Sequence, residues 1–179
     1  MTLNELTKRA KTGDVLLVKS DSTIGKLIRC LTGESYSHVA VLVWVPGQYG
    51  FELLVYEFVE GVGHQTMGLD DWMAQRQDQI LSYGVAPEAV HQSATRARAA
   101  AEYYRTAPLL KRSYGYLSLP KVLLSQLFKC RIPVRQKVCS TFAQEVWRMA
   151  GYDAIGRTAD PGDIAQHCDP LYPLWRQDP

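Results

Sequence analysis

Short apolar runs alternate with turn residues in the first half of the chain. Residues 37–45 (SHVAVLVWV) are rich in β-branched residues and apolar on both faces, which is typical of a buried strand. Residues 51–59 (FELLVYEFV) form a second run of this kind, and the short connection between the two favours an antiparallel hairpin. Residues 15–18 and 79–85 are the other predicted strands. We therefore expect a small antiparallel sheet.

Helical spacing dominates the second half of the chain. Residues 87–106 begin with a proline, which is favoured in the first turn of a helix, and contain an alanine-rich run, so we expect one continuous helix. Residues 120–130 (PKVLLSQLFKC) are predicted to form a second, apolar helix. The segments 109–119 and 131–137 are predicted to be loops.

A further helix is predicted from Cys139 to Ala150. Its apolar residues Phe142, Val146 and Met149 recur at the i, i+4, i+7 spacing, and a glycine follows its end. The other predicted helices are short, and they cover residues 3–11, 22–31, 69–73 and the segment that follows the turn at 159–164. Strands in the first half and helices in the second predict an α+β fold.

Composition narrows the class of protein. The chain has 179 residues, which corresponds to about one domain over residues 1–179. Hydrophobic residues make up 46% and charged residues 21%, values that exclude long disorder. There is no apolar run of about 18 residues, no signal-peptide core, and the four cysteines are scattered. We therefore expect a cytoplasmic protein with reduced thiols, with phage delivery or another export route as the alternative.

The charges are unevenly distributed. Between Arg96 and Lys137 the sequence has ten basic residues and one acidic residue, Glu102, although the whole chain carries only +2. Such a block can attract an anionic partner, such as a phosphate, a carboxylate-rich peptide or a lipid headgroup. The alternative is a solvated basic face without a partner. No basic motif with interleaved aromatic residues and no zinc-finger spacing occurs, so nucleic acid is not favoured.

Several motifs are absent from the sequence. It has no phosphate-binding loop, no Gly-x-Ser-x-Gly segment, no Cys-x-x-Cys pair and no His-Glu-x-x-His segment. We therefore expect no cofactor and no metal site.

Cys139 is the strongest candidate for a nucleophile. It lies where a helix is predicted to begin, and a helix N-terminus stabilises a thiolate and offers amide donors to an oxyanion. The preceding basic residues Arg135 and Lys137 would also stabilise a thiolate at Cys139. The alternative is that Cys139 is a small buried hydrophobic residue, which is the common fate of a free cysteine.

His38 and Glu57 are the candidates for the other two members of a catalytic triad. His38 begins the strongest strand, where a base would be held rigidly, although a histidine satisfied by the backbone is the alternative. Glu57 lies within an apolar strand, where a carboxylate is costly to bury without a partner. On a neighbouring strand it could orient the imidazole, unless that face of the sheet is open to water. Glu52 and Glu60 are weaker choices because they lie nearer the strand ends. The remaining cysteines and histidines are interpreted as structural: Cys30, Cys130, Cys168, His64, His91 and His167.

Four short motifs occur in a characteristic order, and together they resemble one family. They are Gly13-Asp14-Val15-Leu16-Leu17, Tyr36-Ser37-His38-Val39-Ala40-Val41, Val55-Tyr56-Glu57 and Val138-Cys139-Ser140-Thr141-Phe142. The order resembles the circularly permuted papain-fold branch of the NlpC-like superfamily, the YiiX/YaeF-like permuted amidases. Lecithin:retinol acyltransferase-like proteins are more distant relatives. The similarity spans residues 13–163 and implies a single permuted papain-like domain.

The resemblance implies a role for each matching residue. Cys139 would be the nucleophile, His38 the general base and Glu57 the orienting group, with another polar residue as an alternative third member. The resemblance further implies that three aromatic residues line the substrate groove: Tyr36, Tyr114 and Tyr116. The apolar, basic stretch 117–137 has no counterpart in the family pattern, and it could cover the site, form a lid or contact a membrane.

The sequence supports three hypotheses for function. The first is a thiol hydrolase that cleaves an amide bond in a cell-wall peptide, an N-acyl amino acid or a lipid amide through an acyl-enzyme, and we expect its substrate to be anionic. The second is a lipid acyltransferase or thioesterase with the same triad, in which helix 120–130 makes peripheral contact with a membrane. The third is a non-catalytic binding module. The oligomeric state is left open.

Overall fold

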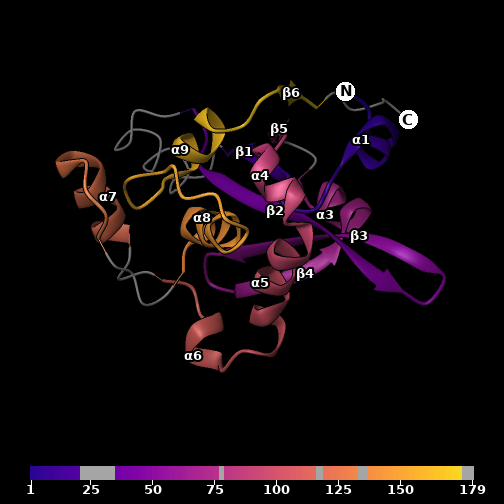
Figure 1. Cartoon of the computed structure of the whole chain (residues 1–179), viewed down its shortest axis with the longest axis horizontal. Helices are drawn as coiled ribbons and strands as arrows, with labels where there is room; N and C mark the ends of the chain where they lie inside the picture. Colours follow the sequence, from indigo (N-terminus) through magenta and orange to yellow (C-terminus); the bar gives the residue numbers. More distant parts are fainter. Residues whose placement is uncertain (21–34, 77–78, 116–118, 133–136, 175–179) are drawn as a thin grey trace.

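The computed structural model describes residues 1–20, 35–76, 79–115, 119–132 and 137–174. Within these ranges, a six-stranded antiparallel sheet has the order β4-β3-β2-β1-β5-β6 (Figure 1). The strands are β1 (Val15–Lys19), β2 (His38–Gly47), β3 (Gly50–Val59), β4 (Gly63–Gly68), β5 (Ile80–Gly84) and β6 (Leu171–Pro173).

Helices cover both faces of this sheet. One face packs against α4, α5, α8 and α9, and the other against α1 and α3. α7 lies apart from the sheet, at the edge of the molecule (Figure 1). Among the helices in the described ranges, none has the length and apolarity needed to cross a bilayer. The helices are α1 (Leu3–Arg9), α3 (Leu69–Ala74), α4 (Glu88–Gln92), α5 (Ala94–Thr106), α6 (Leu109–Arg112), α7 (Leu119–Phe128), α8 (Cys139–Met149) and α9 (Pro161–Gln166).

The two-sided covering explains why the central strands read as continuous apolar runs. Successive side chains of a strand point to opposite faces. In β2, Val39 and Val41 belong to the core beneath α5 and α8, whereas Ala40 and Leu42 belong to the core beneath α1 and α3. All four side chains are fully buried, so β2 lacks the alternation of apolar and polar residues that is typical of a strand with one face in water.

The predicted α+β class and the four predicted strands are confirmed, but two strands were missed. β4 was predicted as a turn followed by a loop because its sequence, Gly63–Gly68, has no alternating pattern. It is a strand because β3 supplies its hydrogen-bonding partners, with Glu57 opposite Gln65 and Phe58 opposite His64. β6 was missed for the same reason, since it is a three-residue edge strand formed on β5.

The prediction of one helix over residues 87–106 is wrong. The backbone leaves the helical region at Ser93 (φ −116°, ψ 33°), which separates α4 from α5. Pro87 is the N-cap residue of α4 and does not lie in its first turn. The predicted loop 109–119 contains the single turn α6 and the first residue of α7. The predicted helix 22–31 lies outside the described residues.

Buried polar contacts at the start of β1 connect this segment to α8, β5 and α4. The indole of Trp147 donates a hydrogen bond of 2.8 Å to the carbonyl of Gly13. The adjacent Asp14 is fully buried, and its carboxylate accepts from the Tyr83 hydroxyl and lies 2.7 Å from Nε2 of His91. The Trp147 hydrogen bond therefore ties α8 to the start of β1, and the Asp14 contacts tie that same segment to β5 and α4.

Candidate active site

Cys139 is the first residue of α8, as the sequence predicts. The preceding residue, Val138, has extended backbone angles, and its amide donates to the Thr141 hydroxyl at 3.0 Å. The N–H groups of the first helical turn have no acceptor within the helix, so their partial positive charges lie near the Cys139 thiol. Cys139 is only 5% exposed, which limits the approach of solvent.

His38 links Cys139 to the sheet. It is the first residue of β2, and its Nε2 lies 2.6 Å from Oε2 of Glu57. Nδ1 is therefore the ring nitrogen left to face the Cys139 side chain, which interacts electrostatically with His38. Burial lowers the pKa of His38, but the Cys139 thiolate and the Glu57 carboxylate outweigh burial and raise it to about 10. The arrangement therefore favours the charged imidazolium form of His38 at neutral pH.

Glu57 is fully buried in β3, beside His38. Its Oε1 accepts from Gln65 at 2.6 Å, and Nη2 of Arg76 lies 2.8 Å and 2.9 Å from its two oxygens. Burial raises the pKa of Glu57, but interactions with His38 and then Arg76 outweigh burial and lower it to about 2. Glu57 is therefore held as a carboxylate that accepts from the imidazole.

Arg76 is a member of this cluster that sequence reasoning missed. It lies just after α3, is 9% exposed, and its guanidinium lies over the Trp72 ring at 4.1 Å from the centroid. A signal was present in the sequence, because Arg76 is the only lysine or arginine in residues 35–95. A buried carboxylate in that region needs a cation, and there is one candidate.

The three predicted groove tyrosines have different positions. The Tyr36 hydroxyl donates to the Ser82 hydroxyl at 3.0 Å, and both Tyr36 and Tyr114 pack against the core beneath α5 and α8. Next to Tyr114, the Gly115 amide donates to the Lys137 carbonyl at 2.9 Å, which brings this segment beside the start of α8. Tyr116 lies outside the described residues.

Within the described part of the chain, the cysteines and histidines that are interpreted as structural lie outside the cluster of Cys139, His38 and Glu57. Burial raises the pKa of the Cys168 thiol to about 12, which disfavours its thiolate. His64, predicted in a loop, lies in β4 among aromatic rings, and burial lowers its pKa to about 4. Cys130 is exposed, whereas Cys30 lies outside the described residues. Among the described residues, no group of three or more histidine, cysteine or acidic side chains is arranged to hold a metal ion.

Two hollows flank α8, and neither is lined by Cys139, His38 or Glu57. The larger, of about 650 Å³, lies between α5 and α8. The smaller, of about 320 Å³, includes Thr141 from the first turn of α8 and Gln144.

Comparisons with known proteins bear on the fold. No family model matches the chain, and no curated protein matches it. Among solved structures, it is similar to the crystal structure of the metalloprotein YiiX from Escherichia coli O157:H7 (DUF1105). The TM-score is 0.52 at 20% sequence identity, over 80% of this chain and 67% of YiiX. At this identity the similarity is evidence for a shared α+β fold alone.

The lowered pKa of Glu57 predicts a specific loss of stability in acid. In the unfolded chain this carboxyl has its ordinary pKa of 4.5, and in the folded protein it has a pKa of about 2. Its contribution, about 3 kcal/mol, is present above pH 4.5 and is lost as the pH falls toward 2. Urea unfolding of the wild type and of Glu57→Gln should show a stability difference that shrinks over this range.

The matched control for this measurement is Glu52→Gln, an exposed position on the same strand. Its stability should follow that of the wild type at every pH. A difference between wild type and Glu57→Gln that stays constant from pH 6 to pH 2.5 would show that Glu57 is not held as a carboxylate.

Proposed function

We propose that this protein is a thiol hydrolase of amide bonds with a permuted papain-like fold. In this proposal Cys139 is the nucleophile, His38 the general base and Glu57 the orienting group. The observation that carries it is the placement of His38 between a buried carboxylate and the cysteine at the N-terminus of α8. That arrangement matches the roles of nucleophile, base and orienter in a triad.

The reaction follows from these positions. The Cys139 thiolate attacks the amide carbonyl carbon, and the oxyanion that forms lies beside the first-turn amides of α8. The His38 imidazolium then donates its proton to the leaving nitrogen as the C–N bond breaks, which leaves a thioester on Cys139. Neutral His38 takes a proton from water, and the resulting hydroxide releases the acyl group as a carboxylic acid. Glu57 holds the imidazole and stabilises its charged form throughout.

The proposed substrates are cell-wall peptides or N-acyl amino-acid and lipid amides that carry negative charge. Support comes from the basic character of residues 96–137 and from the cationic side chains beside α8, which include Arg131, Lys137 and Arg148. Cationic side chains near a site raise the local concentration of anionic substrates.

The proposal predicts the pH dependence of Cys139 alkylation. Because His38 stays protonated through neutral pH, Cys139 should react with iodoacetamide well below pH 7, despite its low exposure. His38→Ala removes the counter-charge, and labelling at pH 6.5 should fall roughly a hundredfold, as for an ordinary thiol with a pKa of about 8.5. Peptide mass spectrometry measures the rate at each cysteine separately.

Cys130 is the internal control, because it is exposed and its labelling should not respond to the change at His38. Equal Cys139 labelling rates in wild type and His38→Ala across the pH range would overturn the proposal and favour a binding module.

A further inference from the structure

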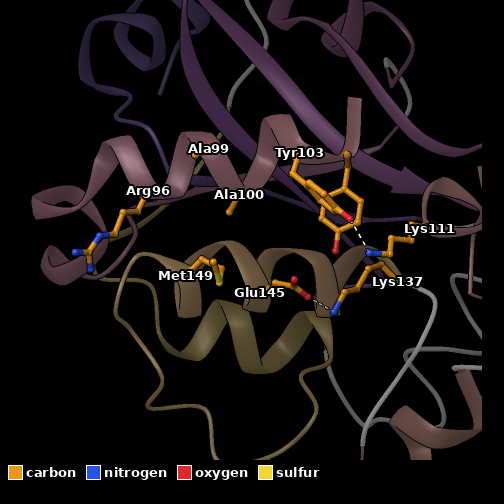
Figure 2. A pocket seen from close by; sticks show the side chains of 9 residues that line it. Arg96, Ala99, Ala100, Tyr103, Lys111, Lys137, Glu145 and Met149 are labelled. Atoms are coloured by element: carbon orange, nitrogen blue, oxygen red, sulfur yellow. Dashed lines mark hydrogen bonds and ion pairs between the residues drawn. The ribbon is translucent and has the colours of Figure 1, made fainter. Parts of the chain in front are cut away.

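The groove between α5 and α8 is built from one face of each helix. On α5, Arg96, Ala99, Ala100 and Tyr103 have the i, i+3, i+4, i+7 spacing that places residues on one side of a helix. Glu145 and Met149 lie one turn apart on α8. The two alanines have no side chain beyond Cβ, so the facing helices leave a hollow of about 650 Å³ (Figure 2). This volume is within the range of small-molecule sites.

The groove is electropositive. Lys111 and Lys137 lie at one end and Arg96 at the other (Figure 2). Among the described residues that line the groove, the one carboxylate is that of Glu145, which forms an ion pair with Lys137. Lys111 hydrogen-bonds a neutral group, the Tyr103 hydroxyl, at 2.6 Å. Among the described lining residues, three cations and one carboxylate give the groove a net positive charge, which attracts an anionic ligand.

Apolar surface accompanies this charge. Met149 is 50% exposed and Tyr103 is 45% exposed, although both are large apolar side chains in the groove wall. Next to Lys111, on α6, Leu109 is 80% exposed and Leu110 is 72% exposed. An exposed apolar group rimmed by charged residues is typical of a binding site. Neither a purely polar anion nor a purely apolar ligand matches both features.

We propose that the α5–α8 groove binds a single anionic amphiphile, a molecule with a carboxylate or phosphate head and an apolar chain. The head lies near Lys111 and Lys137, and the chain lies along Ala99, Ala100 and Met149. This goes beyond the proposed hydrolase activity, because binding requires none of the three triad residues. It nevertheless places the ligand near the site, since Lys137 is two residues, at most about 7 Å of chain, from Cys139.

The test uses the intact protein with ¹³C-methyl-labelled methionine and decanoate, below its micelle concentration, as the probe. The chain has four methionines, and only Met149 lines the groove; Met67 and Met73 pack on the opposite face of the sheet. Decanoate should shift the Met149 methyl signal saturably and leave Met67 and Met73 unchanged. Acetate, which lacks the chain, and decyltrimethylammonium, which has the opposite charge, should each bind at least tenfold more weakly.

Two variants and one control locate the ligand. Ala99→Trp fills the groove from an exposed helix position and should abolish the shift. Lys111→Gln should weaken decanoate binding about two- to fivefold, as expected for one partly exposed ion pair, and the effect should diminish in high salt. Lys121→Gln, at an exposed position of α7, is the matched control and should bind like the wild type.

Several results would overturn the proposal. Equal shifts with decanoate and decyltrimethylammonium would show nonspecific apolar contact. A Met149 response to anionic phosphatidylglycerol vesicles but not to decanoate would show a membrane-docking surface in place of a single-ligand site. Unchanged binding in Ala99→Trp would place the ligand elsewhere. Because the readout is Met149 and not turnover, none of these results depends on whether Cys139 is catalytic.

Discussion

Cys139→Ser is expected to abolish the rapid release of p-nitrophenolate that the wild-type protein gives with p-nitrophenyl acetate. The ester acylates an activated thiolate, so one equivalent of p-nitrophenolate per active site should appear as a burst before slow turnover. A serine hydroxyl at the same position is not ionised at neutral pH, so it supplies no activated anion to attack the ester. We expect the acylation rate to fall by at least about 10³, as for removal of a nucleophile in other triads.

The matched control is Cys130→Ser, since Cys130 is the more exposed of the two thiols. If reactivity followed exposure alone, this variant would lose the burst and Cys139→Ser would keep it. Intact-protein mass spectrometry of the acetylated species identifies which cysteine carries the acyl group. A burst that survives in Cys139→Ser would remove the nucleophile from the proposed mechanism.

Arg76→Met is expected to cost about 3–5 kcal/mol in the free energy of unfolding. The substitution removes one of the two cations beside the fully buried Glu57 carboxylate and leaves that charge compensated by His38 alone among the described residues, and breaking a buried ion pair is strongly destabilising. Urea denaturation measures the loss. Arg131→Met is the control, because its ion pair with Asp153 is exposed at both ends and should contribute less than about 1 kcal/mol.

A double-mutant cycle with Glu57→Gln separates charge pairing from simple packing. Each single variant should have a lower free energy of unfolding than the wild type. The loss in the double variant should be smaller than the sum of the two single losses, because it contains neither member of the buried Glu57–Arg76 ion pair. Arg76 is proposed as a positioning residue, so Arg76→Met should also move the pH profile of Cys139 alkylation toward higher pH. Additive stability losses with an unchanged alkylation profile would reduce Arg76 to a structural residue.

The elements that could be predicted are those whose hydrophobic pattern is local and complete. The run at 37–45 is apolar on both faces, and it forms a central strand covered by helices. β4 could not be found in this way, because its polar residues form a strand only through pairing with β3. The interruption at Ser93 was likewise missed, since good helix formers surround it. Local propensity does not encode where a chain must turn to pack on a sheet.

The same division applies to the candidate site. The sequence by itself determined that Cys139 begins a helix and that a carboxylate at Glu57 would need partners, because helix starts and apolar strands are read from neighbouring residues. Only the tertiary structure decided what those partners are. The β2–β3 register brings His38 to Glu57, and the segment after α3 brings Arg76 to the same carboxylate from 19 residues away. Such contacts depend on sheet register and helix packing, which link residues distant in sequence.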